Sequence, residues 1–192
     1  MRARLARLIL AAFGWKVGPR PPDLLKYVMI AAPHTSSWDV PLLILYGWVF
    51  DMPIRWMMKA EMFRGWRGPF FKSLGGIPID RSQRHNMVQQ CVDILNAADR
   101  MVVVVPPEGT RAAAKGWKTG FYYIAVGAKL PIALGYLDFA RKEGGFGPPL
   151  YPTGDIEADF AVLRAFYQDK KGKYPEKFGP IQVAPREDSH SA

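Results

Sequence analysis

The sequence is short of the residues from which metal sites and disulfides are built. Its 192 residues include one cysteine, Cys91, and three histidines, His34, His85 and His190. A single cysteine excludes a disulfide within the chain, and no set of Cys and His has the spacing of a metal site. We therefore expect a protein of a reducing compartment that binds no metal, in which Cys91 is a core residue of an amphipathic helix.

Long apolar runs are missing as well. A helix needs about 20 consecutive apolar residues to span a bilayer, and the longest apolar stretch here, 40–50, is too short. The N-terminal arginines and the apolar residues after them resemble a signal peptide, but no small-residue cleavage site follows. Trp15 and Lys16 come directly after this stretch. We expect neither a membrane span nor a cleaved signal peptide.

Acidic residues are outnumbered by basic ones. Asp and Glu total 17 against 26 Lys and Arg, so the formal net charge is +9. This charge predicts attraction to an anionic partner, which can be nucleic acid, an anionic membrane or a phosphorylated substrate. Hydrophobic residues make up 49% of the chain. In a chain of this length that is enough for one domain with a full core.

Strand and helix patterns alternate along the chain. Patterns typical of strands occur at 27–32, 55–60, 75–81, 101–107 and 131–139. Patterns typical of helices occur at 1–14, 40–50, 85–99, 118–129 and 156–168. Glycines and prolines predict a loop over 144–149, and a charged, proline-broken stretch from Lys170 predicts a loosely held tail. The alternation predicts an α/β fold, a single domain whose mixed, mostly parallel sheet is flanked by helices.

The first helix pattern is amphipathic. The residues of its apolar face are Leu5, Leu8, Ile9, Ala12 and Phe13. They recur at the spacing of one helical face, and the arginines lie off that face. The helix either packs on its own domain or lies in a membrane interface. We expect membrane docking through Leu5, Leu8, Ile9 and Phe13.

A second stretch, 61–74, mixes bulky apolar residues with cations. It fits a partly exposed surface, with Phe63 and Trp66 toward lipid, and equally a core helix whose cations reach solvent. The expected organisation is an N-terminal amphipathic membrane-docking helix, one main domain and a polar C-terminal tail. The segments that correspond to these parts are 1–18, 19–170 and 171–192.

A histidine and a carboxylate lie at the turn between the strand at 27–32 and the helix that follows. His34 can occupy the loop while Asp39 sits in the first helical turn and accepts a hydrogen bond from one imidazole nitrogen. The other nitrogen would then be free to accept a proton. The alternative is that Ser36, Ser37 or Asp39 only caps the helix, and the pair taken alone favours this alternative.

A second polar cluster, Glu108-Gly109-Thr110-Arg111, follows the valine-rich strand. Arg111 can hold a phosphate through two parallel hydrogen bonds, and Thr110 with the turn N–H groups can add donors. Glu108 can orient Arg111 or accept from a substrate hydroxyl. Arg81 ends another strand and can supply a second cation, although both cations also fit solvated turns. Because open α/β sheets carry their sites at strand ends, two such clusters favour a functional site.

Together these stretches resemble the glycerolipid acyltransferase family, whose members include the lysophosphatidic acid acyltransferases. The resemblance rests on an H-x4-D motif from His34 to Asp39, a glycine-apolar block that ends at Arg81, and an E-G-T-R motif from Glu108 to Arg111. It extends over about residues 27–139, where the family's fourth block is matched loosely by a proline among apolar residues.

The resemblance implies a glycerol-phosphate acyltransferase-like fold and a reaction without bound cofactor, metal or acyl-enzyme. His34, oriented by Asp39, would remove a proton from an acceptor hydroxyl, whose oxygen attacks the thioester of acyl-CoA or acyl-carrier protein. The residues that would hold the acceptor phosphate are Arg81, Glu108, Gly109, Thr110 and Arg111.

The expected acceptor is the lysophospholipid 1-acylglycerol 3-phosphate, which would give phosphatidic acid in phospholipid biosynthesis. The enzyme would then act as a peripheral or monotopic protein at the anionic, cytoplasmic face of the inner (plasma) membrane. One alternative is another lysolipid, such as a lyso-ornithine lipid, and a second is a non-catalytic lipid-binding module of the membrane surface. Nucleic-acid binding ranks last, because the basic residues are spread out and no nucleic-acid motif occurs.

Overall fold

The strands form one sheet. The computed structural model describes residues 1–73, 75–79 and 84–185, and within these ranges seven strands pair in the order β1-β7-β6-β2-β5-β3-β4. The strands are β1 (Lys16–Val17), β2 (Lys26–Ala32), β3 (Ile54–Lys59), β4 (Gly76–Ile79), β5 (Met101–Val105), β6 (Ile132–Asp138) and β7 (Glu143–Phe146). All pairs are parallel except β6 with β7. The predicted α/β fold with a mixed, mostly parallel sheet is confirmed.

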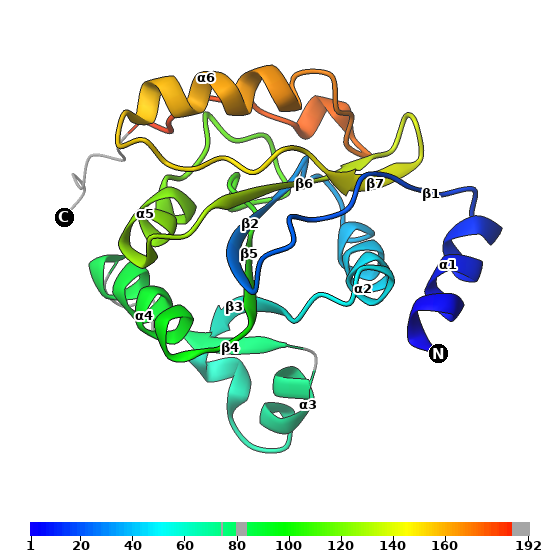
Figure 1. Ribbon diagram of the computed structural model, residues 1–192, viewed down its shortest axis with the longest axis horizontal. Helices are drawn as coiled ribbons and strands as arrows, with labels where there is room; N and C mark the ends of the chain where they lie inside the picture. Colours follow the sequence, from blue (N-terminus) through cyan, green and yellow to red (C-terminus); the bar gives the residue numbers. More distant parts are fainter. Residues whose placement is uncertain (74, 80–83, 186–192) are drawn as a thin grey trace.

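Helices cover both faces of this sheet. The helices are α1 (Arg2–Ala12), α2 (Asp39–Val49), α3 (Arg67–Ser73), α4 (Arg84–Ala97), α5 (Gly120–Ala128) and α6 (Ile156–Tyr167). Two 3₁₀ turns occur at Ala60–Phe63 and Pro175–Lys177. Figure 1 shows α1 and α2 on one side of the sheet and α4, α5 and α6 on the other.

The central strand β2 shows how the core is divided. Its side chains alternate between the two faces, as in any strand. Tyr27 and Met29 pack with α1 and α2, whereas Val28 and Ile30 pack with α4, α5 and α6. All four are buried, which is typical of a parallel strand covered on both faces and explains why this stretch reads as a continuous apolar run.

The stretch 144–149 was expected to be a loop, and this prediction was wrong for residues 144–146, whereas 147–149 have no regular structure. Residues Glu143–Phe146 form β7, which pairs antiparallel with β6. A Cβ atom at Gly144 would collide with the ring of Tyr46, which packs against the backbone there. Glycine is thus required by the close approach of α2, a contact that local sequence pattern does not reveal.

The expectation of a loosely held tail from Lys170 was also wrong for the part that the structure describes. The N–H of Tyr174 donates to Thr35 Oγ1 at 3.2 Å, close to the His34 turn. Val183 forms a bridge with Trp117, and Ile181 is buried. The segment 170–185 is therefore part of the domain, because its backbone donors find partners in the loops at the carboxyl ends of the strands.

The apolar residues of α1 divide between protein and solvent. Ala6 and Leu10 are buried in the cluster that includes α2, so the helix does pack on its own domain. Of the face predicted to dock on a membrane, Leu5, Leu8 and Phe13 are exposed, with Leu8 at 70%. The helix therefore anchors through one side and leaves the predicted apolar stripe uncovered.

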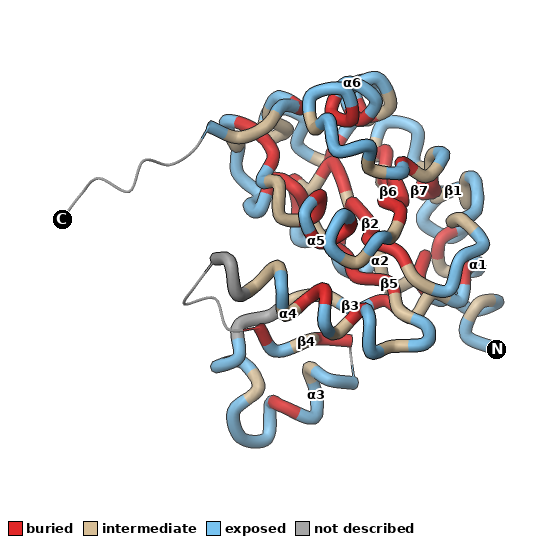
Figure 2. Tube along the Cα trace, turned by 60° about the vertical axis from the view of Figure 1, so that its left-hand side comes forward, coloured by how far each residue is buried: buried red, intermediate tan, exposed pale blue. Residues whose placement is uncertain are grey.

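The segment that contains α3 stands apart from the main body in Figures 1 and 2. Trp66 is 80% exposed, Phe70 is also exposed, and Phe63 is half-buried against Phe71. Of the two predicted readings, the partly exposed surface is the one observed. In the part of the chain that the structure describes, no helix is long and apolar enough to cross a membrane.

Candidate active site

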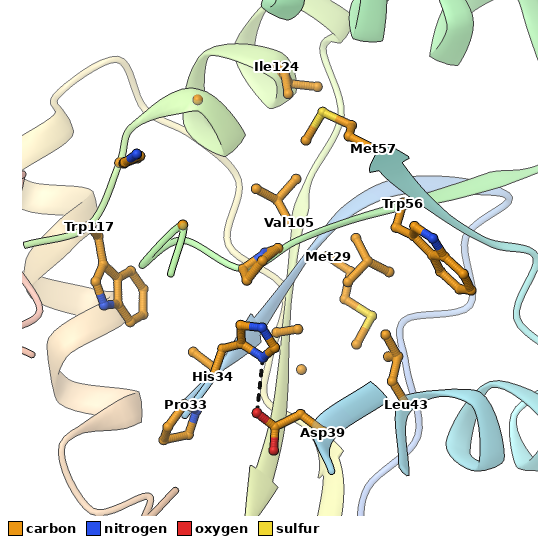
Figure 3. A pocket seen from close by; sticks show the side chains of 18 of the residues that line it. Met29, Pro33, His34, Asp39, Leu43, Trp56, Met57, Val105, Trp117 and Ile124 are labelled. Atoms are coloured by element: carbon orange, nitrogen blue, oxygen red, sulfur yellow. Dashed lines mark ion pairs between the residues drawn. The ribbon is translucent and has the colours of Figure 1, made fainter. Parts of the chain in front are cut away.

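The turn between β2 and α2 brings a histidine and a carboxylate together. His34 Nδ1 lies 3.0 Å from Asp39 Oδ2, the contact marked by the dashed line in Figure 3. The same oxygen accepts the Ser36 N–H at 3.0 Å. Asp39 is buried, whereas the His34 side chain keeps 20% of its surface exposed. With Nδ1–H donating to Asp39, Nε2 carries a free lone pair and can accept a proton.

The simple helix cap considered from the sequence is not what these side chains form. The N-cap residue of α2 is Trp38, and it makes no side-chain cap bond. Asp39 accepts from Ser36 N–H inside the turn, and Ser36 Oγ accepts the Trp38 N–H at 3.1 Å. These bonds hold the turn in one shape, so the carboxylate is directed at the imidazole and not at the free N–H groups of the helix.

The E-G-T-R cluster meets this turn because β5 lies beside β2 in the sheet. Glu108 Oε1 accepts the main-chain N–H of His34 at 3.0 Å, although 74 positions separate the two residues. Glu108 is buried. Burial raises the pKa of its carboxyl to about 7, and the His34 N–H opposes that rise. The second motif therefore holds the backbone of the first.

Two buried oxygens at this site find no hydrogen-bond partner among the described residues. They are Asp39 Oδ1 and Glu108 Oε2. A buried polar atom without a partner costs free energy, typically about 1–3 kcal/mol. Such atoms are unusual in a folded core, and here both belong to residues that contact His34.

The remaining residues of the cluster lie at the outer side of the turn. Arg111 is exposed, and its guanidinium donates to Ser37 Oγ. Thr110 Oγ1 accepts the Ala112 N–H at 3.2 Å and so closes its own loop. Of the two roles considered for Glu108, orientation of Arg111 is not observed, because Glu108 holds the His34 backbone instead. Arg81, also expected here, lies outside the described residues.

A cavity of about 1250 Å³ opens beside His34 and Asp39. Most of its described lining is apolar, with Met29 and Leu43 on the α2 side and Met57 and Ile124 on the other. Figure 3 shows these side chains around one space. The histidine and the carboxylate therefore stand at the edge of a large apolar chamber.

The cavity reaches both faces because the sheet opens at this point. The ladder between β3 and β5 stops at the pair Trp56 and Val104, whereas β3 stays paired with β4 as far as Lys59. Trp56 and Met57, with Val105 opposite, line the cavity there. The separation of β3 from β5 is a tertiary feature that no strand pattern in the sequence indicates.

One charged residue of the cavity was missed by sequence reasoning. Lys118 lines the cavity, but its sequence surroundings predict the first residue of a helix. The helix α5 begins at Gly120, with Thr119 as N-cap, so Lys118 belongs to the preceding loop. Nothing in the sequence pattern marks it, because its position depends on the path of the loop over the E-G-T-R turn.

Comparison with known proteins agrees with this arrangement. A family model described as "Acyltransferase" matches residues 22–134. No curated protein matches the chain. Among solved structures, the chain is similar to the 1-acyl-sn-glycerophosphate (LPA) acyltransferase PlsC from Thermotoga maritima, with a TM-score of 0.60 and 15% identity. The similarity covers 90% of this chain and 80% of that one, and it concerns the fold.

The family match spans the His34 turn, the E-G-T-R turn and the sheet that joins them. Because it covers more than half of the chain, the protein belongs to the acyltransferase family.

Proposed function

We propose that this acyltransferase moves a fatty acyl group from acyl-CoA or acyl-carrier protein to the hydroxyl of a lysophospholipid. The proposed acceptor is 1-acylglycerol 3-phosphate, and the product is phosphatidic acid. The observation that carries the proposal is the contact between His34 and Asp39 at the edge of a large apolar cavity. A proton acceptor beside an apolar chamber is what transfer of a fatty acyl group to a hydroxyl requires.

The proposed reaction proceeds in two proton transfers. His34 Nε2 takes the proton of the acceptor hydroxyl while Asp39 stabilises the imidazolium through Nδ1–H. The acceptor oxygen attacks the thioester carbonyl, the C–S bond breaks, and the proton on His34 passes to the leaving thiolate. A positioned base of this kind typically contributes ~10²–10⁴-fold to the rate. The scheme uses no bound cofactor and no metal.

The cavity is proposed to receive an acyl chain. Its lining includes Met29, Leu43 and Met57, and each methylene group that leaves water for such a surface contributes about 0.8 kcal/mol. In this scheme the phosphate of the acceptor stays toward the rim, where Arg111 is exposed beside Ser37. Arg81 is proposed to join it there.

We also propose that the protein docks on the anionic cytoplasmic face of the inner (plasma) membrane. The exposed residues Leu5, Leu8, Phe13 and Trp66 support this, whereas Ile9 and Phe63 are half-buried and would contribute less. Each large apolar side chain that leaves water contributes about 1.5–3 kcal/mol, against about 1 kcal/mol for an arginine near the surface. High salt alone should therefore fail to release the protein from anionic vesicles, and full release would contradict apolar docking.

The function is tested with purified wild-type protein and His34→Ala. Acyl-CoA and acyl-carrier protein are each offered with 1-acylglycerol 3-phosphate, a lyso-ornithine lipid and a monoacylglycerol, and thiol release and lipid products are measured. We expect phosphatidic acid from the wild type and a loss of about 10²–10⁴-fold in the variant. A product from the lyso-ornithine lipid alone would reassign the acceptor. Thiol release from no combination would favour a lipid-binding module.

A further inference from the structure

The cavity beside His34 contains one positively charged residue that neither motif supplies. Among the described residues that line the cavity, Lys118 is the only lysine, and there is no arginine. Arg111 does not line the cavity and is bound to Ser37 on the outer side of the turn. The cation that lines the cavity is therefore a different residue from the cation of the E-G-T-R motif.

The backbone around Lys118 is held in place by loops from two other parts of the chain. Its N–H donates to the carbonyl of Pro107 at 2.8 Å, directly before Glu108. The preceding residue, Trp117, donates to Gln182 at 2.7 Å and is fully buried. The lysine backbone is thus attached to the same turn whose glutamate holds His34.

The side chain of Lys118 lies over Gly109. A Cβ atom at position 109 would be 3.0 Å from Lys118 Cδ and 3.3 Å from Nζ. Gly109 also has a positive φ of 66°, so a glycine is favoured here both by the backbone conformation and by the space that the lysine occupies. The ammonium group therefore sits above the E-G-T-R turn, next to the residues that contact His34.

This ammonium group has no anionic partner within the described part of the chain. No carboxylate oxygen there lies within salt-bridge distance of Lys118 Nζ. Four other charged side chains, by contrast, belong to ion pairs in which Arg141 and Lys170 contact Asp138 and Asp169. An exposed lysine that lines the cavity and has no anionic partner among the described residues is available to an anionic group of a substrate.

We propose that Lys118 binds the phosphate of the acceptor at the rim of the cavity, above the E-G-T-R turn, and thereby selects phosphate-bearing lysolipids. This inference rests on the proposed function, and it adds to the phosphate contacts proposed for Arg81 and Arg111 a residue that lies outside the E-G-T-R and glycine-apolar motifs. The ammonium group is exposed at the cavity beside the E-G-T-R turn, and it can donate charge-assisted hydrogen bonds to phosphate oxygens. The hydroxyl to be acylated then lies on the His34 side of the bound phosphate.

The test compares Lys118→Met with Lys115→Met, a matched change at an exposed lysine that does not line the cavity. KM is measured for 1-acylglycerol 3-phosphate, for an uncharged monoacylglycerol and for acyl-CoA. For Lys118→Met we expect KM to rise at least about tenfold for the phosphate acceptor, since a charge-assisted contact is lost. KM for the other two substrates and all constants of Lys115→Met should stay within about twofold, and Lys118→Arg should recover most of the loss.

Two results would overturn the proposal. An equal rise of KM for both acceptors would mean that Lys118 shapes the cavity and does not read phosphate. A rise confined to acyl-CoA would assign the bound phosphate to the donor. Binding of a soluble short-chain lysophosphatidate, measured by NMR titration, keeps the question separate from turnover. If the wild type transfers no acyl group, the proposed function fails, yet equal binding by wild type and Lys118→Met would still refute the role of Lys118.

Discussion

Buried carboxylates occur in two regions of the molecule, and their surroundings differ. Asp159 in α6 accepts three hydrogen bonds, from Tyr122 OH at 2.8 Å, from Thr153 N–H at 2.9 Å and from the Thr153 hydroxyl at 3.1 Å. Asp39 and Glu108, beside the cavity, are equally buried, but each leaves one oxygen without a partner among the described residues.

The difference separates a carboxylate that holds the fold from carboxylates that serve a site. Both oxygens of Asp159 are satisfied, so it joins α5, α6 and the loop before α6 at no cost in unpaired groups. Burial and the bond to Asp159 also raise the pKa of Tyr122 to about 12, so this hydroxyl stays a donor at neutral pH. Asp39 and Glu108 instead each use one oxygen to position His34. Their second oxygens are buried without a partner among the described residues, and the fold tolerates the free energy that this costs.

The largest effect that would test this comparison is expected from Asp39→Asn. The amide keeps an oxygen for the Ser36 N–H, but it carries no charge to stabilise the protonated His34. We expect kcat to fall by about 10²–10⁴-fold, with the free energy of unfolding in urea changed by less than about 1 kcal/mol. A large loss of stability with little loss of kcat would place Asp39 in the same class as Asp159.

The reverse pattern is expected from Asp159→Ala. The substitution removes three hydrogen bonds to a charged group and leaves Tyr122 and Thr153 with unpaired donors, so the free energy of unfolding should fall by about 3–4 kcal/mol. Acyl transfer below the melting temperature should keep its kcat within about twofold. Denaturant unfolding and thiol release report the two quantities, and a selective loss of kcat would break the comparison.

A smaller effect, dependent on pH, is expected from Glu108. Because its pKa is raised to about 7 in the folded protein, the folded state binds a proton more tightly than the unfolded state. Its contribution to stability is therefore present in acid and is lost as the pH rises through 7. Between pH 5 and pH 8 the wild type should lose about 2–3 kcal/mol relative to Glu108→Gln, which keeps an acceptor for the His34 N–H.

The control for this measurement is Glu61→Gln, a change at an exposed glutamate. Its unfolding free energy should follow that of the wild type across the same pH range. If the difference in unfolding free energy between wild type and Glu108→Gln does not change with pH, Glu108 is charged in the folded protein. Glu108 and Asp159 would then differ in their hydrogen bonding alone.

Much of the site could be predicted from the sequence because its parts are local. The contact of His34 with Asp39 spans one turn, and the strand before it and the helix after it are read from apolar runs. The resemblance to the acyltransferase family depended on the same short motifs. One of the two roles considered for Glu108, orientation of Arg111, was also a local inference. It is not observed, because each of these side chains has a partner 74 positions away.

The sequence by itself determined the order of β2 to β6 and of the five longer helices, the single domain and the turn that joins His34 to Asp39, but not β1 or β7. These follow from hydrophobic periodicity and turn chemistry, which act over a few residues. Only the tertiary structure decided that Glu108 holds His34, that Lys118 enters the cavity, and that Gly144 belongs to a strand. These contacts depend on which strands become neighbours in the sheet, and that choice is made by burial of the whole core.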